Sequence, residues 1–298
     1  RMTTVTALVG RNLRIYFRDR AAVMLSLLSA LILLLLYLLF LGSLQVDTLQ
    51  ERLPDADGDD IAGFVGSWVF AGIVMISTFT TGLAALGSYV DDRSSGRFKE
   101  FRVSPIRRWQ LILGYQLAAV VVATLMSTVL LLVGALLMLV LYGHFPAPLD
   151  LLRAFGLIVL LSTAFAAFSS FVLTFIGTAS AYTALSTIVG TLLGFLAGAY
   201  LPLGLLSRTI GDVINSMPFS PAAMLLREPL AGDALDRLVA HVPESHRETA
   251  RTEIADYYGF DLRIGDLVIE PLWALVGLVV MAVVFTALGA WRIGRSIR

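Results

Sequence analysis

The sequence predicts an all-α membrane protein, with six transmembrane helices in a single transmembrane domain that covers residues 1–298. Composition is the first reason: 57% of the residues are hydrophobic and 15% are charged, whereas soluble domains are about 45–50% apolar and about 25% charged. The second reason is that the apolar residues form uninterrupted blocks. About 20 consecutive apolar residues are enough for a helix to cross a bilayer.

Six blocks reach this length, and their cores contain no Asp, Glu, Lys or His. The predicted spans are residues 21–43, 61–89, 111–142, 151–176, 181–201 and 271–291. Ion-driven transporters carry titratable side chains inside the bilayer, where they bind the driving ion. These spans therefore offer no proton relay.

The distribution of charge predicts the orientation. Six spans place both termini on one side, and cytoplasmic segments of membrane proteins are enriched in Lys and Arg. With cytoplasmic termini, the inner segments hold 14 basic and four acidic residues, and the outer segments hold eight basic and 18 acidic residues. We therefore expect an integral protein of the cell membrane, with both termini in the cytoplasm.

Residues 5–20, before the first span, have an amphipathic helical pattern at about 100° per residue. An apolar face, interrupted by Asn12, lies opposite a cationic face. The two faces consist of Val5, Leu8, Val9, Leu13 and Tyr16, and of Arg11, Arg14 and Arg18. The pattern predicts a helix in the inner interface with its cations toward lipid phosphates, although a simple basic cap on the first span would look similar.

The fifth span contains Gly190, Gly194 and Gly198 at intervals of four residues. Small residues at this spacing allow two helices to approach closely. The sequence therefore predicts a packing ridge, and the helix against it can come from the same chain or from a second copy.

The segment after the fifth span is rich in proline. Pro202 ends the span, and residues 203–229 contain two short apolar runs separated by Pro218 and Pro221. We predict re-entrant outer helices here, with a surface helix as the alternative. Residues 231–266 are charged and predict an extracellular cap that is helical over 244–258, with solvated histidines rather than a metal site.

Sequence signatures of catalysis are missing. The single lysine, Lys99, follows Phe98, so no phosphate-binding G-x-x-x-x-G-K-[ST] loop occurs, nor do H-E-x-x-H and G-x-S-x-G motifs. The chain has no cysteine, which excludes disulfides and thiolate metal sites. We therefore expect no enzyme activity, metal or cofactor in this chain, and any work it performs must be powered from outside.

Residues 91–108, between the second and third spans, carry six of the 22 basic residues. A short helix over 94–101 would place two phenylalanines on one face, and a proline break would follow. We predict that this coupling loop docks into a cytoplasmic partner, although it could serve topology alone. The candidate coupling residues are Arg93, Gly96, Arg97, Phe98, Glu100, Phe101, Ser104 and Pro105.

The order of these short motifs resembles that of permeases of type-2 ATP-binding-cassette exporters, especially the drug-resistance branch. The matching motifs are Asp92–Arg93, Gly96, Phe98–Phe101, Ser104–Pro105, Gly114–Tyr115, the runs 198–202 and 217–221, and Leu226–Arg227. Arg18–Asp19 is similar to a family Arg-Asp-Pro motif, with Arg20 in place of proline. The resemblance implies a dimer of permeases, a separate ATPase subunit that binds ATP and Mg, and residues 94–104 as the coupling element.

We expect such a chain to export a hydrophobic or amphipathic drug or natural product, because the spans carry no charged groups except Arg153, which lies at the end of the fourth span. The alternatives are a lipid or lipid-linked glycan exporter of the same family, and an autonomous secondary transporter. A nucleic-acid partner is not indicated, because the net charge is zero. The second span offers candidate side chains for a substrate path: Trp68, Phe70, Met75, Thr78, Phe79 and Thr81.

Overall fold

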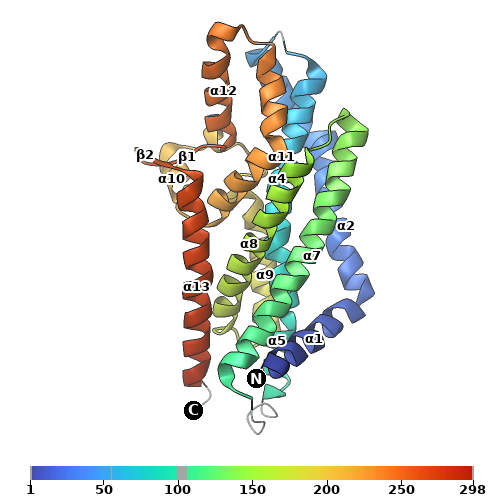
Figure 1. Ribbon diagram of the computed structural model, residues 1–298, viewed down its shortest axis with the longest axis vertical. Coiled ribbons are helices and arrows are strands. Elements are labelled where there is room, and N and C mark those ends of the chain that lie inside the picture. The colour runs from blue at the N-terminus through green and yellow to red at the C-terminus, as the bar shows by residue number, and fades with distance from the viewer. Residues whose placement is uncertain (1, 55, 99–105, 297–298) are drawn as a thin grey trace.

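The structure, a computed structural model, describes residues 2–54, 56–98 and 106–296. It is an elongated helical bundle with both termini at one end (Figure 1), which we call the terminal end. The opposite end carries α12 (Glu244–Tyr258) and a short hairpin of β1 (Leu262–Ile264) and β2 (Leu267–Ile269), and we call it the cap end.

Six helices are long and apolar enough to cross a membrane. They are α2 (Arg20–Leu36), α4 (Gly58–Ala85), α7 (Arg108–Tyr142), α8 (Pro148–Leu173), α9 (Ala179–Leu196) and α13 (Pro271–Ser296). The prediction of a six-span helical membrane protein is confirmed.

Local capping explains where several helices begin. The Asp19 carboxylate accepts a hydrogen bond of 3.0 Å from the backbone N–H of Ala22, and it separates α2 from α1 (Met2–Arg18). Thr178 caps α9 in the same way. Pro148 stands in the first turn of α8, where its missing N–H costs nothing.

The first two spans continue beyond their predicted ends. After α2 come a π-helix (Tyr37–Leu41) and α3 (Gly42–Arg52), so the chain stays helical past Ser43. The second span bends at Leu86 and continues as α5 (Gly87–Ser94). Hydropathy marks where hydrocarbon ends, whereas a helix can continue into water because its backbone hydrogen bonds are internal.

Helix α4 forms the centre of the bundle, in contact with α2, α3, α7, α8, α9 and α11 (Phe219–Ala240). Almost all of its side chains are buried. Glycines permit these contacts: a Cβ on Gly72 would meet Ala199, and a Cβ on Gly134 of α7 would meet the ring of Phe70. Because it is surrounded, α4 is hydrophobic on all sides, as expected for a buried helix.

The predicted pair of short re-entrant helices differs from the structure in length. The first part consists of a 3-10 turn (Leu203–Leu205) and α10 (Arg208–Asn215), but the second apolar run begins the 22-residue helix α11, which continues through Pro229 to Ala240. Its apolar side chains pack on α4 and α8, and this burial compensates for the proline.

The cap end contains the predicted helix over 244–258, which is α12. The sequence analysis did not predict the hairpin. Its signal was the two-residue loop Gly265–Asp266, in which Gly265 has φ +60°, a conformation that glycine adopts without steric cost.

Candidate coupling site

Asp92 lies in the last turn of α5 and is 1% exposed. Its carboxylate accepts two hydrogen bonds from Arg11 of α1, at 2.7 and 2.9 Å, and one from the Tyr115 hydroxyl of α7. Arg97 adds a longer contact of 3.3 Å. Such a bidentate, charge-assisted pair fixes the relative position of its helices, so Asp92 joins the start of the coupling loop to α1 and α7.

Helix α1 is attached to the bundle through the face that carries Asn12. The Asn12 amide donates to the Gly114 carbonyl of α7 at 3.4 Å. Beside it, a Cβ on Gly114 would lie 2.6 Å from the Cβ of Leu8, so only glycine allows this approach. Asn12, which interrupted the predicted apolar face, is therefore a contact to α7.

Arg11 departs from the predicted orientation of the α1 cations toward lipid phosphates, because it turns inward to Asp92. The hydrogen bond to Asp92 raises the pKa of Arg11 above its ordinary value, although partial burial opposes the shift. Asp92, and not a lipid phosphate, is therefore the anion that pairs with Arg11. Ile15 and Phe17, further along α1, remain exposed.

Arg93 connects α5 to a third element. Its guanidinium donates to the carbonyls of Thr174 and Ile176, at 2.9 and 3.1 Å, directly after the end of α8. Carbonyls at a helix C-terminus have no partner within the helix and carry partial negative charge. We refer to Arg11, Asp92, Arg93 and Tyr115 together as the Asp92 junction, which contacts α1, α7 and the end of α8.

The described part of the coupling loop turns sharply after α5. Gly96 has φ +79°, where residues with a Cβ are strained, so the predicted helix over 94–101 is interrupted at this glycine. Phe98 packs edge-on against Tyr89 at 5.5 Å between ring centroids. Arg97 is largely exposed. Glu100, Phe101, Ser104 and Pro105 lie outside the described residues.

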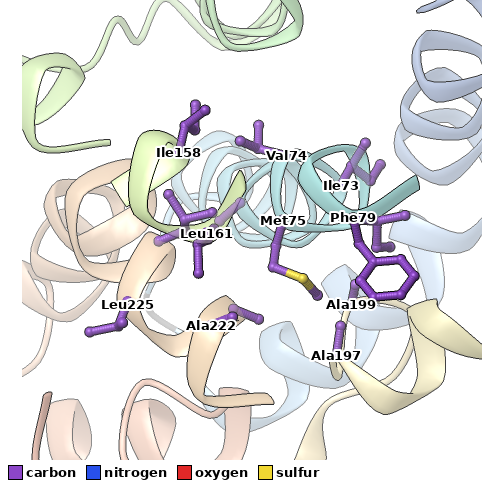
Figure 2. Close-up of a cluster of buried hydrophobic side chains, with 14 of the residues drawn as sticks. Ile73, Val74, Met75, Phe79, Ile158, Leu161, Ala197, Ala199, Ala222 and Leu225 are labelled. Atoms are coloured by element: carbon purple, nitrogen blue, oxygen red, sulfur yellow. The ribbon is translucent and has the colours of Figure 1, made fainter. Parts of the chain in front are cut away.

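The six residues proposed for a substrate path are all at most 5% exposed, because α4 is surrounded by other helices. The Trp68 indole donates to the Tyr258 carbonyl at 2.9 Å. Thr78 bonds the Met75 carbonyl of its own helix. Figure 2 shows Met75 and Phe79 directed into a packed apolar cluster with Ala197, Ala199 and Ala222.

Of these six residues, Thr81 lines a cavity, of about 370 Å³, between α2, α4 and α9. We call this cavity the hydroxyl groove, because much of its lining carries hydroxyl groups. Its polar side chains belong to Ser26, Ser29, Ser77, Thr80, Thr81 and Tyr200. The lining does not include Trp68, Phe70, Met75, Thr78 or Phe79, so Thr81 is the predicted path residue that borders this cavity. The sequence analysis missed Ser26, Ser29, Ser77, Thr80 and Tyr200, and the four-residue spacing of Ser77 and Thr81 was the available signal.

The predicted glycine ridge is not continuous. Helix α9 ends at Leu196, and Gly198 lies beyond it with φ +60°, where the chain reverses direction. A Cβ on Gly194 would meet the ring of Tyr200 from the same chain, so Gly194 permits this reversal. Gly190 lines the hydroxyl groove and has open space around it.

Arg227 of α11 holds this reversal in place and is fully buried. Its guanidinium donates to the carbonyls of Ala197 and Gly198 after α9, at 3.0 and 2.8 Å, and to Gly259 after α12, at 2.6 Å. Burial lowers its pKa to about 9, which leaves it charged at neutral pH. Two helix C-termini thus provide the negative partial charge that this cation needs.

The described residues thus form a polytopic helical membrane subunit, whose loop between the second and third spans is anchored to three other elements. The family model of the ABC-2 family transporter protein matches residues 42–291, most of the chain. The chain therefore belongs to the ABC-2 transporter family and is a membrane transport subunit. None of the curated proteins compared with it gives a match.

Proposed function

We propose that this chain is the membrane-spanning subunit of an ATP-driven exporter of the drug-resistance type, which moves a hydrophobic or amphipathic drug or natural product outward. A separate ATPase subunit binds ATP and Mg, and two copies of the chain form the transporter. The observation that carries the proposal is the Asp92 junction, because it links the coupling loop to three elements that a partner must move together.

The junction supports a route for mechanical coupling. A partner that binds the loop near Phe98 pulls on α5, and α5 is joined by charge-assisted hydrogen bonds to α1, α7 and the end of α8. ATP binding can shift the conformation of this chain only if the ATPase contacts the chain differently in the two states. The coupling loop supplies these contacts, and the rigid junction converts them into motion of the spans.

The hydroxyl groove supports the choice of substrate class. Its described lining combines apolar side chains with hydroxyl groups and contains no Asp, Glu, Lys or Arg. Such a surface suits an amphipathic molecule without strong charge. A lipid with a small polar head would also fit this chemistry, and lipid-linked cargo is therefore the second candidate.

Exposed surfaces of α2 and α9 support a second copy beside the groove. Thr183, Thr187 and Thr191 are exposed and follow each other at four-residue intervals on α9, each bonded to its own helix. Small residues in such a row favour close helix packing in membranes. A second copy over this face would enclose the groove between the two chains.

Reconstitution tests the proposed function. The tagged chain is purified with its co-purifying subunits, the ATPase is identified by mass spectrometry, and the complex is placed in vesicles. We expect ATP-dependent movement of Nile red, an uncharged fluorescent amphipathic dye, that persists when an ionophore collapses ion gradients. Transport that stops with the ion gradient and needs no ATP would instead establish a secondary transporter.

The coupling assignment has its own test. Phe98→Ala removes the ring packed on Tyr89, and we expect a chain that inserts normally but loses ATPase co-purification or substrate-stimulated ATP turnover. Phe145→Ala is the matched control, because Phe145 is an exposed phenylalanine between α7 and α8. Full ATP turnover and export in Phe98→Ala would rule out this role for the loop.

A further inference from the structure

A second cavity, of about 390 Å³, lies between α8, α13, the hairpin and the corner that joins α10 to α11. It shares no lining residue with the hydroxyl groove. Its volume falls within the range of about 300–1,000 Å³ that is usual for small-molecule sites. We call it the α13 pocket.

The interior of the α13 pocket is apolar. Among the described residues that line it, polar side-chain atoms come only from Asn215, Ser216 and Trp273. The Asn215 amide already donates to the Arg263 carbonyl at 2.9 Å and accepts from Ser220 at 2.8 Å, and Ser216 donates to the Val213 carbonyl. A buried water needs two to four polar partners, and the satisfied Asn215 and Ser216 offer it little. The pocket therefore favours a hydrocarbon ligand over water.

The pocket follows α13 over several turns. Trp273, Gly277, Met281 and Phe285 line it at intervals of four residues, so they form one row on the helix. Twelve residues of helix correspond to about 18 Å. Phe285, the last residue of this row, packs edge-on against Phe168 of α8, with 5.1 Å between the ring centroids.

The exposed tryptophans of α13 indicate where the pocket lies in the bilayer. Trp273 and Trp291 stand 18 residues apart and are both exposed, a separation of about 27 Å along a helix. Tryptophans favour the two membrane interfaces, and the hydrocarbon core is about 30 Å thick. The pocket thus runs from the interface at the cap end to a little past the bilayer centre.

The pocket opens toward lipid. Val276 and Val280 on α13 are about half exposed and apolar, so hydrocarbon surrounds this face of the helix. Gly277 lies among them, and no heavy atom lies within 4 Å of an ideal Cβ there. The absent side chain leaves an opening between the lipid and the pocket.

We propose that the α13 pocket binds one acyl chain of a membrane phospholipid from the cap-end leaflet, with its headgroup near Trp273. The lipid connects α8, α13 and the α10–α11 corner, and it is distinct from any molecule transported through the hydroxyl groove. This inference does not depend on the proposed export function, because it concerns a lipid-facing site of the isolated subunit.

The test uses the full-length chain in dodecyl maltoside micelles, to which a phosphatidylcholine with a diazirine on its acyl chain is added in increasing amounts. After irradiation, we expect labels on Met217 and Met281 that saturate as the probe fraction rises and decline with excess unlabelled phosphatidylcholine. Lipid contact at the exposed Val283 should rise linearly instead. Equal, linear labelling at both places would refute the site.

Substitutions at Gly277 provide matched variants. Gly277→Phe fills the pocket and should abolish the saturable labelling, whereas Gly277→Ala should retain it. Val276→Phe adds the same ring on the lipid face and should also retain it. Saturable labelling that survives in Gly277→Phe would contradict the proposal.

A second probe identifies the source of the acyl chain. Hexadecanoic acid with a diazirine is a free single chain without a phospholipid headgroup. We expect the phospholipid probe to label the pocket at lower mole fraction. Saturable labelling by the fatty acid alone would mean that the pocket takes a free amphiphile, and the phospholipid assignment would be wrong.

Discussion

At the scale of single residues, two buried charges organise the two ends of the molecule. Asp92 at the terminal end is paired with Arg11 and Tyr115, and Arg227 on the cap side is paired with carbonyls that end α9 and α12. Burying a charge is costly unless it is paired and hydrogen-bonded. Each charge therefore holds several elements in one arrangement.

Asp92→Asn keeps the size of the side chain but removes its charge. Hydrogen bonds to a charged group contribute about 1.5–3 kcal/mol each, reduced here because Arg11 is about one-third exposed to solvent. We expect a lower unfolding temperature in detergent and a loss of ATP-driven transport in the reconstituted complex. Asp91→Asn, at the exposed neighbouring position, should leave both measurements unchanged.

Arg227→Met should reduce the free energy of unfolding by about 3 kcal/mol or more, because three buried carbonyls lose their donor. Arg227→Lys should be intermediate, since one ammonium cannot reach both helix ends as a planar guanidinium does. Chemical denaturation in detergent measures both changes. Arg237→Met on the exposed face of the same helix is the control, and an equal effect there would contradict this role.

At the scale of elements, α4 is the helix on which the others pack, and its aromatic side chains are part of that packing. Phe70, one of the predicted path residues, fills the space left by Gly134 of α7. A side chain that fits a glycine in this way is constrained by packing density. We therefore assign Phe70 to the contact between α4 and α7.

Gly134→Ala should destabilise the chain, because its Cβ would overlap the Phe70 ring. Overpacking of this kind typically costs about 1–3 kcal/mol. Adding Phe70→Leu should restore part of the loss by making room, and a double-mutant cycle measures the coupling. Gly156→Ala, on a helical glycine with open space around it, serves as the control. Additive effects of Gly134→Ala and Phe70→Leu would disprove direct packing.

At the scale of the whole molecule, exposed apolar side chains lie along several spans, and α2, α9 and α13 are the least buried of the six. Lipid covers such surface without difficulty, but the hydroxyl groove between α2, α4 and α9 is better covered by protein. We therefore expect the proposed second copy to cover α2 and α9, and the proposed phospholipid to bind beside α13.

The absence of cysteine from the sequence allows a direct test, because any introduced cysteine is unique. Ile188→Cys and Leu192→Cys on exposed positions of α9 should form cross-linked dimers with a short bismaleimide in membranes. Val283→Cys on exposed α13 is the control and should remain monomeric. Efficient cross-linking through Val283→Cys alone would show that the dimer interface lies on α13 and not on α9.

Much of the fold followed from the sequence, because a membrane-spanning helix requires a long apolar run and such runs are visible without three-dimensional information. The boundaries were less predictable. Helices continued into α3 and α5, and α11 was longer than its apolar run, because tertiary packing stabilises helical segments that hydropathy does not distinguish.

The candidate site was predictable only in part. The charged loop and its Asp92–Arg93 pair were visible as a motif, but their partners Arg11 and Thr174 lie 81 residues away from them in the sequence. For the proposed path residues, the sequence showed the chemistry of the side chains but not their burial. Their chemistry suited a ligand, yet five of them are in the core because α4 is enclosed on every side.

The sequence by itself determined the class of this protein: six apolar segments without Asp, Glu, Lys or His, and a basic loop between the second and third. Only the tertiary structure decided which charges are paired, which side of α4 borders the hydroxyl groove, and that α13 borders a pocket of its own. The physical reason is that partitioning into a membrane depends on the composition of each segment, whereas pairing and cavities depend on which distant segments pack together.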